Sequence, residues 1–231
     1  MTNAGLYRAT PAAGTNWFSG LPAHVRQEME RCMTRQSTGA GQTIFLAGEC
    51  ADSMYRIASG RVRVRSLSPG GKEVLLLIYG AGHFIGTVAV LDGLPRHNDA
   101  VAECATELDM LRSDDFHRIA QAYPEVYRAI AVSYALWMRD HQSMFAGGES
   151  LEERLARRLN LLLDFGAAQE ADGGILRLDF TQEMLASSVA VTRQAISKLL
   201  QKWQVDGVID YKHGSVIVRD RTRLRQLATR H

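Results

Sequence analysis

The segment from Phe180 to Leu200 constrains the fold of this chain most, because its apolar residues follow the spacing of two short helices joined by a tight turn. The apolar stripe comprises Met184, Leu185, Ile196, Leu199 and Leu200. Ala186 is small at the position where the two helices would cross, and Thr192 is placed to cap the start of the second helix. This pattern is typical of a helix-turn-helix, in which the second helix enters the major groove of DNA.

The polar face of the same segment carries side chains that hydrogen-bond bases or phosphates. Arg193 can donate to both O6 and N7 of a guanine, and Gln194 matches the edge of an adenine. Nearby hydroxyl and ammonium groups suit the phosphate backbone. The candidate DNA contacts are therefore Thr181, Thr192, Arg193, Gln194, Ser197 and Lys198. A helical hairpin with a solvated polar face shows the same local pattern, so the surrounding sequence has to decide.

Two β-rich runs follow the second helix and predict a wing. Residues 208–211 and 215–218 flank a turn that contains Gly214. Residues 181–231 hold nine Lys or Arg against four Asp or Glu, although the whole chain has a net charge of only +2. Such a concentration of basic residues is expected of a module that binds phosphates. Lys212 at the wing tip is a further candidate contact, with simple solvation of a turn lysine as the alternative.

Between residues 39 and 112, short apolar runs alternate with glycine-bearing turns. Many short strands at this spacing indicate a sandwich or barrel, and residues 61–65 alternate Arg and Val as a strand with one wet face does. We therefore predict a jelly roll, or double-stranded β-helix. Its strands are expected at residues 43–46, 54–57, 61–65, 74–78, 100–102 and 107–111, with corners at Gly48, Gly60, Gly70, Gly71, Gly80, Gly82 and Gly86.

A long helical period follows, from about residue 124 to 146. Its apolar members are Tyr127, Ile130, Ala131, Tyr134, Trp137, Met138, His141 and Phe145. This surface exceeds what one face of a β-roll covers, so the helix is expected to form a dimer seam; the alternative is that it packs only on its own β-domain. Gly147 and Gly148 then interrupt the pattern, and residues 150–153 form a capping box that starts a new helix.

Composition places the chain among ordinary globular proteins, with 231 residues, 46% hydrophobic and 23% charged, enough for two domains. No apolar run is long enough for a membrane span and the N-terminus lacks the apolar block of a signal peptide, so we expect a cytoplasmic protein with no membrane partner. Cys32, Cys50 and Cys104 are odd in number and widely spaced, which predicts no metal site and packed or idle thiols, with a redox role for one of them left open.

Catalytic motifs are missing from the sequence. A β-roll enzyme of the metal-dependent kind needs His-x-His with a downstream carboxylate, and this ligand set does not occur. The sequence also has no Gly-rich phosphate loop with its Lys-Ser/Thr pair and no recognisable Ser/His/Asp arrangement. We therefore expect a protein that is not an enzyme.

The complete chain is expected to be an α+β protein with an N-terminal jelly roll, a long dimerisation helix and a C-terminal winged helix-turn-helix. Residues 1–15 form a disordered N-terminus, 16–122 an effector-binding β-roll, 123–148 the dimerisation helix and hinge, and 149–231 the winged-helix DNA-binding domain.

This order of parts resembles the Crp/Fnr family of bacterial transcription regulators over nearly the whole chain. The resemblance is carried by residues 44–49, 55–64, 80–86, 90–96 and 192–194. It implies a homodimer, joined through helix 124–146, that binds an effector in the β-roll and a palindromic site in double-stranded DNA, with RNA polymerase as a further partner. The family's DNA-reading helix usually opens with Ser or Thr, Arg and Glu; Gln194 departs from this, so the half-site should differ from the commonest one.

The effector pocket matches the family only in part. In cyclic-nucleotide-binding relatives a Glu after the glycine corner holds the ribose and an Arg further on holds the phosphate. Gly86 and Arg96 are present here, but Thr87 replaces the Glu and His97 replaces a small hydroxyl residue. Arg96 can still bind a small anionic group through its planar fork, aided by backbone amides of residues 86–89.

Several interpretations of the effector stay open. An altered ligand is favoured over a cyclic nucleotide, and a metal, haem or redox centre would need ligands such as His83, His97 or Cys104. Loss of the Glu also fits a protein that binds DNA unaided. A different class of function is a nucleotide-sensing module whose winged helix contacts proteins; the basic C-terminal segment disfavours it. The operator, and whether the protein activates or represses, leave no readable pattern.

Overall fold

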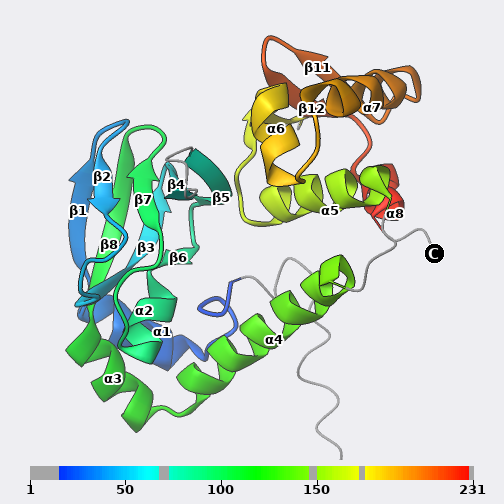
Figure 1. Cartoon of the computed structure of the whole chain (residues 1–231). Helices are drawn as coiled ribbons and strands as arrows, with labels where there is room; N and C mark the ends of the chain where they lie inside the picture. Colours follow the sequence, from blue (N-terminus) through cyan, green and yellow to red (C-terminus); the bar gives the residue numbers. More distant parts are fainter. Residues whose placement is uncertain (1–15, 68–72, 146–149, 172–174, 229–231) are drawn as a thin grey trace, which may run out of the picture.

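The computed structural model describes residues 16–67, 73–145, 150–171 and 175–228. The segment expected to be disordered, 1–15, the glycine corners at 70–71 and the glycine interruption at 147–148 lie outside the described residues. The described chain is an α+β protein with the predicted order of a jelly roll, a long helix and a winged helix-turn-helix (Figure 1). Among its helices, none combines the length and the apolar character needed to cross a bilayer.

Two four-stranded antiparallel sheets form the jelly roll, with strand orders β1-β8-β3-β6 and β2-β7-β4-β5. The strands are β1 (Thr34–Thr38), β2 (Thr43–Phe45), β3 (Ser53–Ser59), β4 (Arg61–Leu67), β5 (Glu73–Gly80), β6 (Phe84–Ile85), β7 (Asp99–Ala102) and β8 (Thr106–Arg112). In β4, Val62 is fully buried while Arg63 and Arg65 on the other face pair with Glu103 and Asp99. This alternation places one face of the strand on the core, as the Arg-Val pattern predicted.

Four helices accompany the roll: α1 (Ala23–Arg31), α2 (Thr87–Asp92), α3 (Ser113–Ala122) and α4 (Glu125–Phe145). The start of α4 is buried against the roll at Val126, Ala129 and Ile130. Further along, Tyr134, Leu136, Trp137 and Met138 are exposed. The helix therefore leaves its own domain about halfway along its length, and Figure 1 shows it running beneath the C-terminal domain.

The C-terminal domain has the predicted winged-helix arrangement. Its elements are α5 (Leu151–Asp164), β9 (Gln169–Ala171), β10 (Ile175–Asp179), α6 (Gln182–Ser188), α7 (Arg193–Val205), β11 (Ile209–Lys212), β12 (Ser215–Val218) and α8 (Arg221–Leu227). The apolar residues predicted from the helix-turn-helix pattern lie in or against one core with the leucines of α5. Trp203 is fully buried, and its indole Nε1 donates to Glu152 Oε1 at 2.8 Å, which ties α7 to the start of α5.

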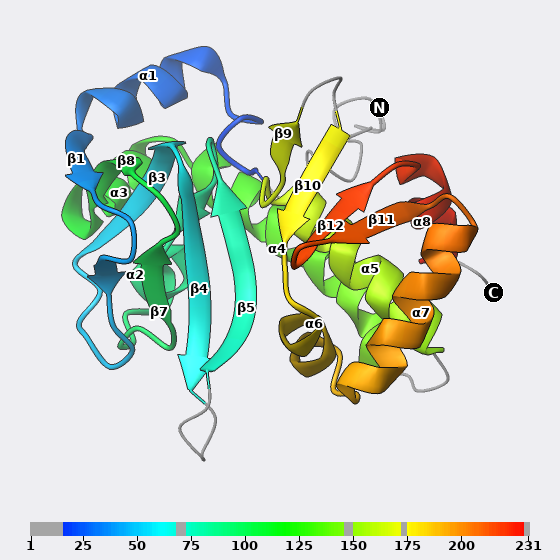
Figure 2. The same ribbon diagram turned by 90° about the horizontal axis from the view of Figure 1, so that it is seen from above.

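Strand β5 joins the two domains. Leu75 and Ile78 belong to the core of the C-terminal domain, and Figure 2 shows β5 as the strand of the roll nearest to it. The amide of Gly80 donates to the carbonyl of Phe165 at 2.7 Å. A methyl group at Gly80 would collide with the backbone of Gly166, so glycine is needed for this close approach.

Candidate functional site

The two helices of the helix-turn-helix start at threonine caps. Thr181 Oγ1 accepts from the amide of Met184 at 3.2 Å, and Thr192 Oγ1 accepts from the amide of Ala195 at 3.3 Å. Each hydroxyl satisfies an amide that the first helical turn leaves unpaired and keeps its own proton to donate. Both expected phosphate contacts therefore also begin a helix. The turn between the helices places Ala190 at φ +55°, a left-handed conformation that is uncommon outside glycine.

Helix α7 presents the predicted polar face to solvent. Arg193, Gln194 and Lys198 are exposed and Ser197 is half-buried. In Figure 1 this helix lies on the side of α5 away from α4, so neither the roll nor the long helix covers it. The surface thus brings together a guanidinium, an amide, a hydroxyl and an ammonium group at the end of the helix that enters a major groove in such motifs.

Arg193 has partners within the motif. Its side chain is 66% exposed, and Nε lies 3.3 Å from Gln182 Oε1 and 3.2 Å from Glu183 Oε1. Exposed ion pairs of this kind contribute about 0–1 kcal/mol. The guanidinium is therefore held at the N-terminal end of α7 by weak contacts, and replacing them with a base or a phosphate costs little free energy. Sequence reasoning did not identify Glu183 as a neighbour of this position.

The wing is a hairpin with a two-residue turn. Lys212 pairs with Ser215 in the register of β11 and β12, and the intervening His213 and Gly214 have φ of +51° and +76°. Two consecutive positive φ values are the requirement of a type I′ turn, whose twist matches that of the strands. Lys212 and His213 are exposed beside this turn. The candidate lysine contact consequently stands at the tip of a rigid hairpin.

Some of the basic residues of the C-terminal segment form ion pairs within the domain. Arg219 pairs with Asp210 at 2.6 Å, and Arg221 and Arg225 lie 2.6 Å and 3.6 Å from Asp164. Figure 1 shows α8 against α5, at the end of the domain opposite α6. The charge count alone could not separate these structural arginines from those on α7.

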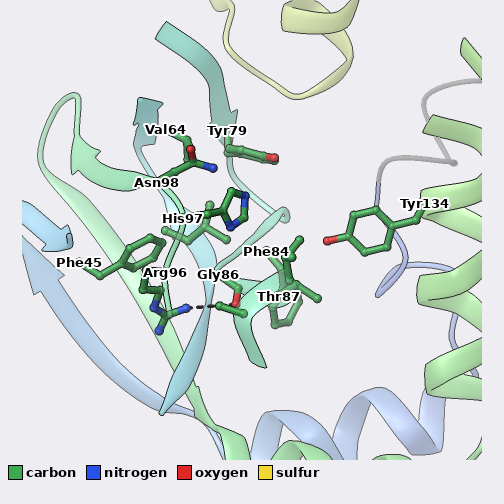
Figure 3. A pocket seen from close by; sticks show the side chains of 13 residues that line it. Phe45, Val64, Tyr79, Phe84, Gly86, Thr87, Arg96, His97, Asn98 and Tyr134 are labelled. Atoms are coloured by element: carbon green, nitrogen blue, oxygen red, sulfur yellow. Dashed lines mark hydrogen bonds between the residues drawn. The ribbon is translucent and has the colours of Figure 1, made fainter. Parts of the chain in front are cut away.

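Two adjoining cavities, of about 90 and 430 Å³, lie between the roll and α4. The four candidate effector residues, Gly86, Thr87, Arg96 and His97, all line the smaller one (Figure 3). Gly86 has φ +78°, and a side chain there would collide with the guanidinium of Arg96. The fold therefore brings the predicted turn and the predicted arginine into direct contact.

The Arg96 guanidinium donates to backbone rather than into open space. It is 4% exposed, Nη1 donates to the Gly86 carbonyl at 3.1 Å, and Nη2 donates to the Ser53 carbonyl. Its Cζ lies 4.3 Å from the centroid of the Phe45 ring. Burial lowers the pKa of Arg96, and the opposing influences of Tyr55, Asp52 and Glu49 are smaller. These two bonds use one N–H group of each terminal nitrogen, and Nε lacks a partner among the described residues, so the guanidinium keeps N–H groups that can donate to a ligand.

The larger cavity is lined by aromatic side chains from distant parts of the chain, which sequence reasoning did not assign to the pocket: Trp17, Tyr79, Phe84, Tyr134, Trp137 and Phe165. Tyr134 points its phenol from α4 toward Thr87 and Phe84 (Figure 3). Although Tyr134 as a residue is 38% exposed, desolvation where its phenol faces the cavity raises its pKa to about 12, with the Asp92 carboxylate adding to the effect. Burial, and secondarily Tyr134, also raises the pKa of Tyr79. Both phenols therefore stay protonated at neutral pH and can donate hydrogen bonds.

The potential metal ligands do not gather. Over the described ranges, no group of three or more His, Cys, Asp or Glu side chains is placed to hold an ion. His83 is buried with Nδ1 3.3 Å from the Gly80 carbonyl, whereas His97 is exposed at the cavities. Cys50 is exposed, and Cys32 and Cys104 are half-buried; all three are free thiols.

Comparison with known families matches both halves of the chain. Residues 35–123 match the cyclic nucleotide-binding domain, and residues 153–227 match the Crp-like helix-turn-helix domain. The cyclic AMP receptor protein of Thermus thermophilus is 29% identical over 217 residues, which cover 93% of this chain and 97% of that protein. The CRP-like cAMP-activated global transcriptional regulator of Mycobacterium tuberculosis is 29% identical over 192 residues, covering 81% of this chain and 85% of the relative.

Solved structures agree with this assignment. The crystal structure of a CRP/FNR-family transcriptional regulator from Thermus thermophilus superposes with a TM-score of 0.64 at 25% identity, covering 84% of this chain and 98% of the other. FixK2 from Bradyrhizobium japonicum has a TM-score of 0.68 at 20% identity, over 86% and 98% of the two chains, and shows the shared fold. The chain therefore belongs to the Crp/Fnr family of bacterial transcription regulators and is a DNA-binding regulator rather than an enzyme.

Proposed function

We propose that this regulator acts as a homodimer on a palindromic DNA site and is controlled by an effector in the β-roll that is not held in the usual cyclic-AMP manner. The observation that carries the DNA part is the exposed start of α7, where Arg193 and Gln194 stand side by side with Lys198 one turn further along. This arrangement suits a guanine followed by an adenine in each half-site. Lys212 at the wing tip, and the hydroxyls of Thr181 and Thr192, would contact the flanking phosphates.

The dimer part rests on α4. Its second half exposes Tyr134, Leu136, Trp137 and Met138 although its first half is buried. Tyr134, Trp137 and Met138 follow the three-to-four spacing of one helix face, whereas Leu136 lies on the opposite side. An exposed apolar face of this kind is buried when the same face of a second copy packs against it. Two α7 helices related by a two-fold axis would then read two half-sites.

Substitution of Arg193 tests the DNA part. Binding sites are first selected from random duplex DNA with the parent protein, and a mobility-shift titration then compares the selected site with unrelated DNA. Arg193→Ala should lower affinity for the selected site by about 1–3 kcal/mol while weak binding to unrelated DNA persists. Arg223→Ala removes an exposed arginine of α8, which donates to the Asp206 carbonyl, and serves as the matched control.

Two outcomes would contradict the proposal. If Arg193→Ala discriminates between the two DNAs as well as Arg223→Ala does, α7 is not part of the interface. If the affinity of the parent protein for DNA does not fall steeply with salt, protein contacts are favoured for the winged helix.

A cyclic nucleotide is the second candidate effector, because Arg96 lines the smaller cavity and two relatives are named for cyclic AMP. A ligand that binds only the folded state raises the melting temperature by mass action. Melting curves with millimolar cyclic AMP, for the parent and for Arg96→Met, therefore decide between the two effectors. A large rise that Arg96→Met abolishes would establish the cyclic nucleotide.

A further inference from the structure

The larger cavity has the chemistry of a site for uncharged ring compounds. Its volume of about 430 Å³ falls in the range of small-molecule sites, and six of its lining residues are aromatic. Among the described residues that line it, none is Asp, Glu, Lys or Arg. Apart from His97, the described lining offers a phosphate no side chain that could carry a positive charge, and burying an unpaired anion costs far more than burying an apolar ring.

A buried hydroxyl without a hydrogen-bond partner faces this apolar space. Thr87 is only 5% exposed, and its side-chain Oγ1 has no hydrogen-bond partner among the described residues. Thr87 lines both cavities and lies opposite the Tyr134 phenol (Figure 3). Buried hydroxyls are normally paired, so an orphaned one at a cavity wall indicates a missing partner. The residue that replaces the family's ribose-binding Glu thus supplies a neutral hydrogen bond.

The residues that line the cavity come from the β-roll, from the long helix α4 and from the start of the C-terminal domain, which are the parts that an effector would have to link. Trp17 precedes α1, Thr87 begins α2, Tyr134 and Trp137 belong to α4, and Phe165 follows α5. The Phe165 carbonyl also accepts from Gly80 across the domain junction. A ligand in contact with Phe165 and α4 would therefore stabilise one relative placement of the two domains.

We propose that the larger cavity binds an uncharged, ring-containing small molecule that hydrogen-bonds to Thr87, and that this molecule is the effector. The second half of this statement rests on the proposed function, because only a regulator controlled through its β-roll needs an effector. The first half is a property of the cavity and is tested without DNA.

The probe is N-phenyl-1-naphthylamine, an uncharged ring compound whose fluorescence rises in apolar surroundings, titrated into the full chain. Val88 lines both cavities and is 36% exposed, so Val88→Trp fills the space from its mouth. Leu94, 62% exposed and absent from the cavity wall, gives the matched control Leu94→Trp. We expect saturable binding of one probe per chain, at least tenfold weaker in Val88→Trp and changed less than twofold in Leu94→Trp. Val88→Phe replaces Val88→Trp if circular dichroism shows that the larger ring prevents folding.

Three results would overturn the inference: no saturable binding, equal affinity in the filled and control variants, or displacement of the probe by cyclic AMP at concentrations below those of the probe itself. The effector role is then read from DNA affinity with and without saturating probe, where a change of at least threefold is expected and no change overturns that role. Loss of specificity in Arg193→Ala is measured separately, so a failed regulator proposal and a failed cavity proposal give different results.

Discussion

At the N-terminal end of α7, a carboxylate of the same motif would compete with DNA for Arg193 if this arginine makes the proposed base contact. Glu183 lies 3.2 Å from the guanidinium, and both side chains are more than 60% exposed. The pair restrains the arginine in the free protein, but it must be exchanged when the arginine contacts a base. Glu183 also adds a negative charge beside the expected phosphate contact Thr181. On the proposed interface, a residue outside the reading helix would therefore limit the strength of DNA binding.

Glu183→Gln should tighten DNA binding by up to about fivefold, which corresponds to the roughly 1 kcal/mol upper value of an exposed ion pair. Fluorescence anisotropy with the selected site measures the change, and it should shrink as salt screens the pair. Glu28→Gln breaks a comparable surface pair with Arg31 in α1 and is the control. Equal tightening in both variants would show that overall charge, and not the Arg193 contact, is responsible.

At the scale of elements, local chemistry predicted some parts and missed others. The capping box was predicted correctly: Ser150 Oγ accepts from the Glu153 amide, and the Glu153 carboxylate accepts from the Ser150 amide. Strand β1 was missed because Thr34–Thr38 has no apolar alternation and is held by backbone pairing and polar side-chain contacts with β8. Helix α2 was missed because six residues between Gly86 and Gly93 carry too little periodicity.

The candidate site divides in the same way. Gly86 and Arg96 are ten residues apart and belong to one sequence motif, the glycine corner followed by an arginine, so the sequence could predict that they meet. Trp17, Tyr134 and Phe165 meet only after α4 and the domain junction are in place, and their sequence pattern is that of ordinary core or seam residues. The aromatic lining therefore depends on tertiary packing, and no local sequence pattern predicts it.

The junction between β5 and α5 should be sensitive to a single methyl group. Gly80→Ala would press against the Gly166 backbone and disturb the Gly80–Phe165 hydrogen bond, and we expect a loss of about 1–3 kcal/mol in the free energy of unfolding. Urea unfolding measures this loss, and hydrogen exchange should report faster exchange at residues 75–80. Gly20→Ala meets only an ordinary contact with the Trp17 carbonyl and should leave both quantities nearly unchanged. Unaltered exchange in Gly80→Ala would mean that the junction tolerates displacement.

At the scale of the whole molecule, α4 links the cavity to the proposed second copy. Met138 is 57% exposed, in the half of α4 that has left the roll. Met138→Lys should weaken self-association at least tenfold, because it places a charge in an apolar seam. Sedimentation velocity across a dilution series checks this. Leu94→Lys alters an exposed apolar residue elsewhere and should behave as the parent does. A monomeric parent protein, or equal association in both variants, would exclude the α4 seam.

His83 gives the junction a dependence on pH. Its ring lies 5.5 Å from Phe165 and 6.3 Å from Tyr79, and its Nε2 has no partner in the described part of the chain. Burial lowers the pKa of His83, and hydrogen bonds to the Gly80 and Ala81 carbonyls oppose this only in part. The unfolded chain therefore takes up a proton near pH 6.5 that the folded protein resists until lower pH.

The free energy of unfolding should therefore fall as pH drops below 6.5, by at most about 1.4 kcal/mol per pH unit, until the lowered pKa of His83 is reached. Urea unfolding between pH 7.5 and 5 measures this slope. Because His83→Gln cannot titrate, its slope should be smaller, although burying an amide there lowers its stability at every pH. His213→Asn, at the exposed wing turn, keeps a residue that tolerates positive φ and should retain the parent slope. Equal slopes in the parent and His83→Gln would assign the pH dependence to other groups and show that protonation of His83 does not affect the stability of the junction.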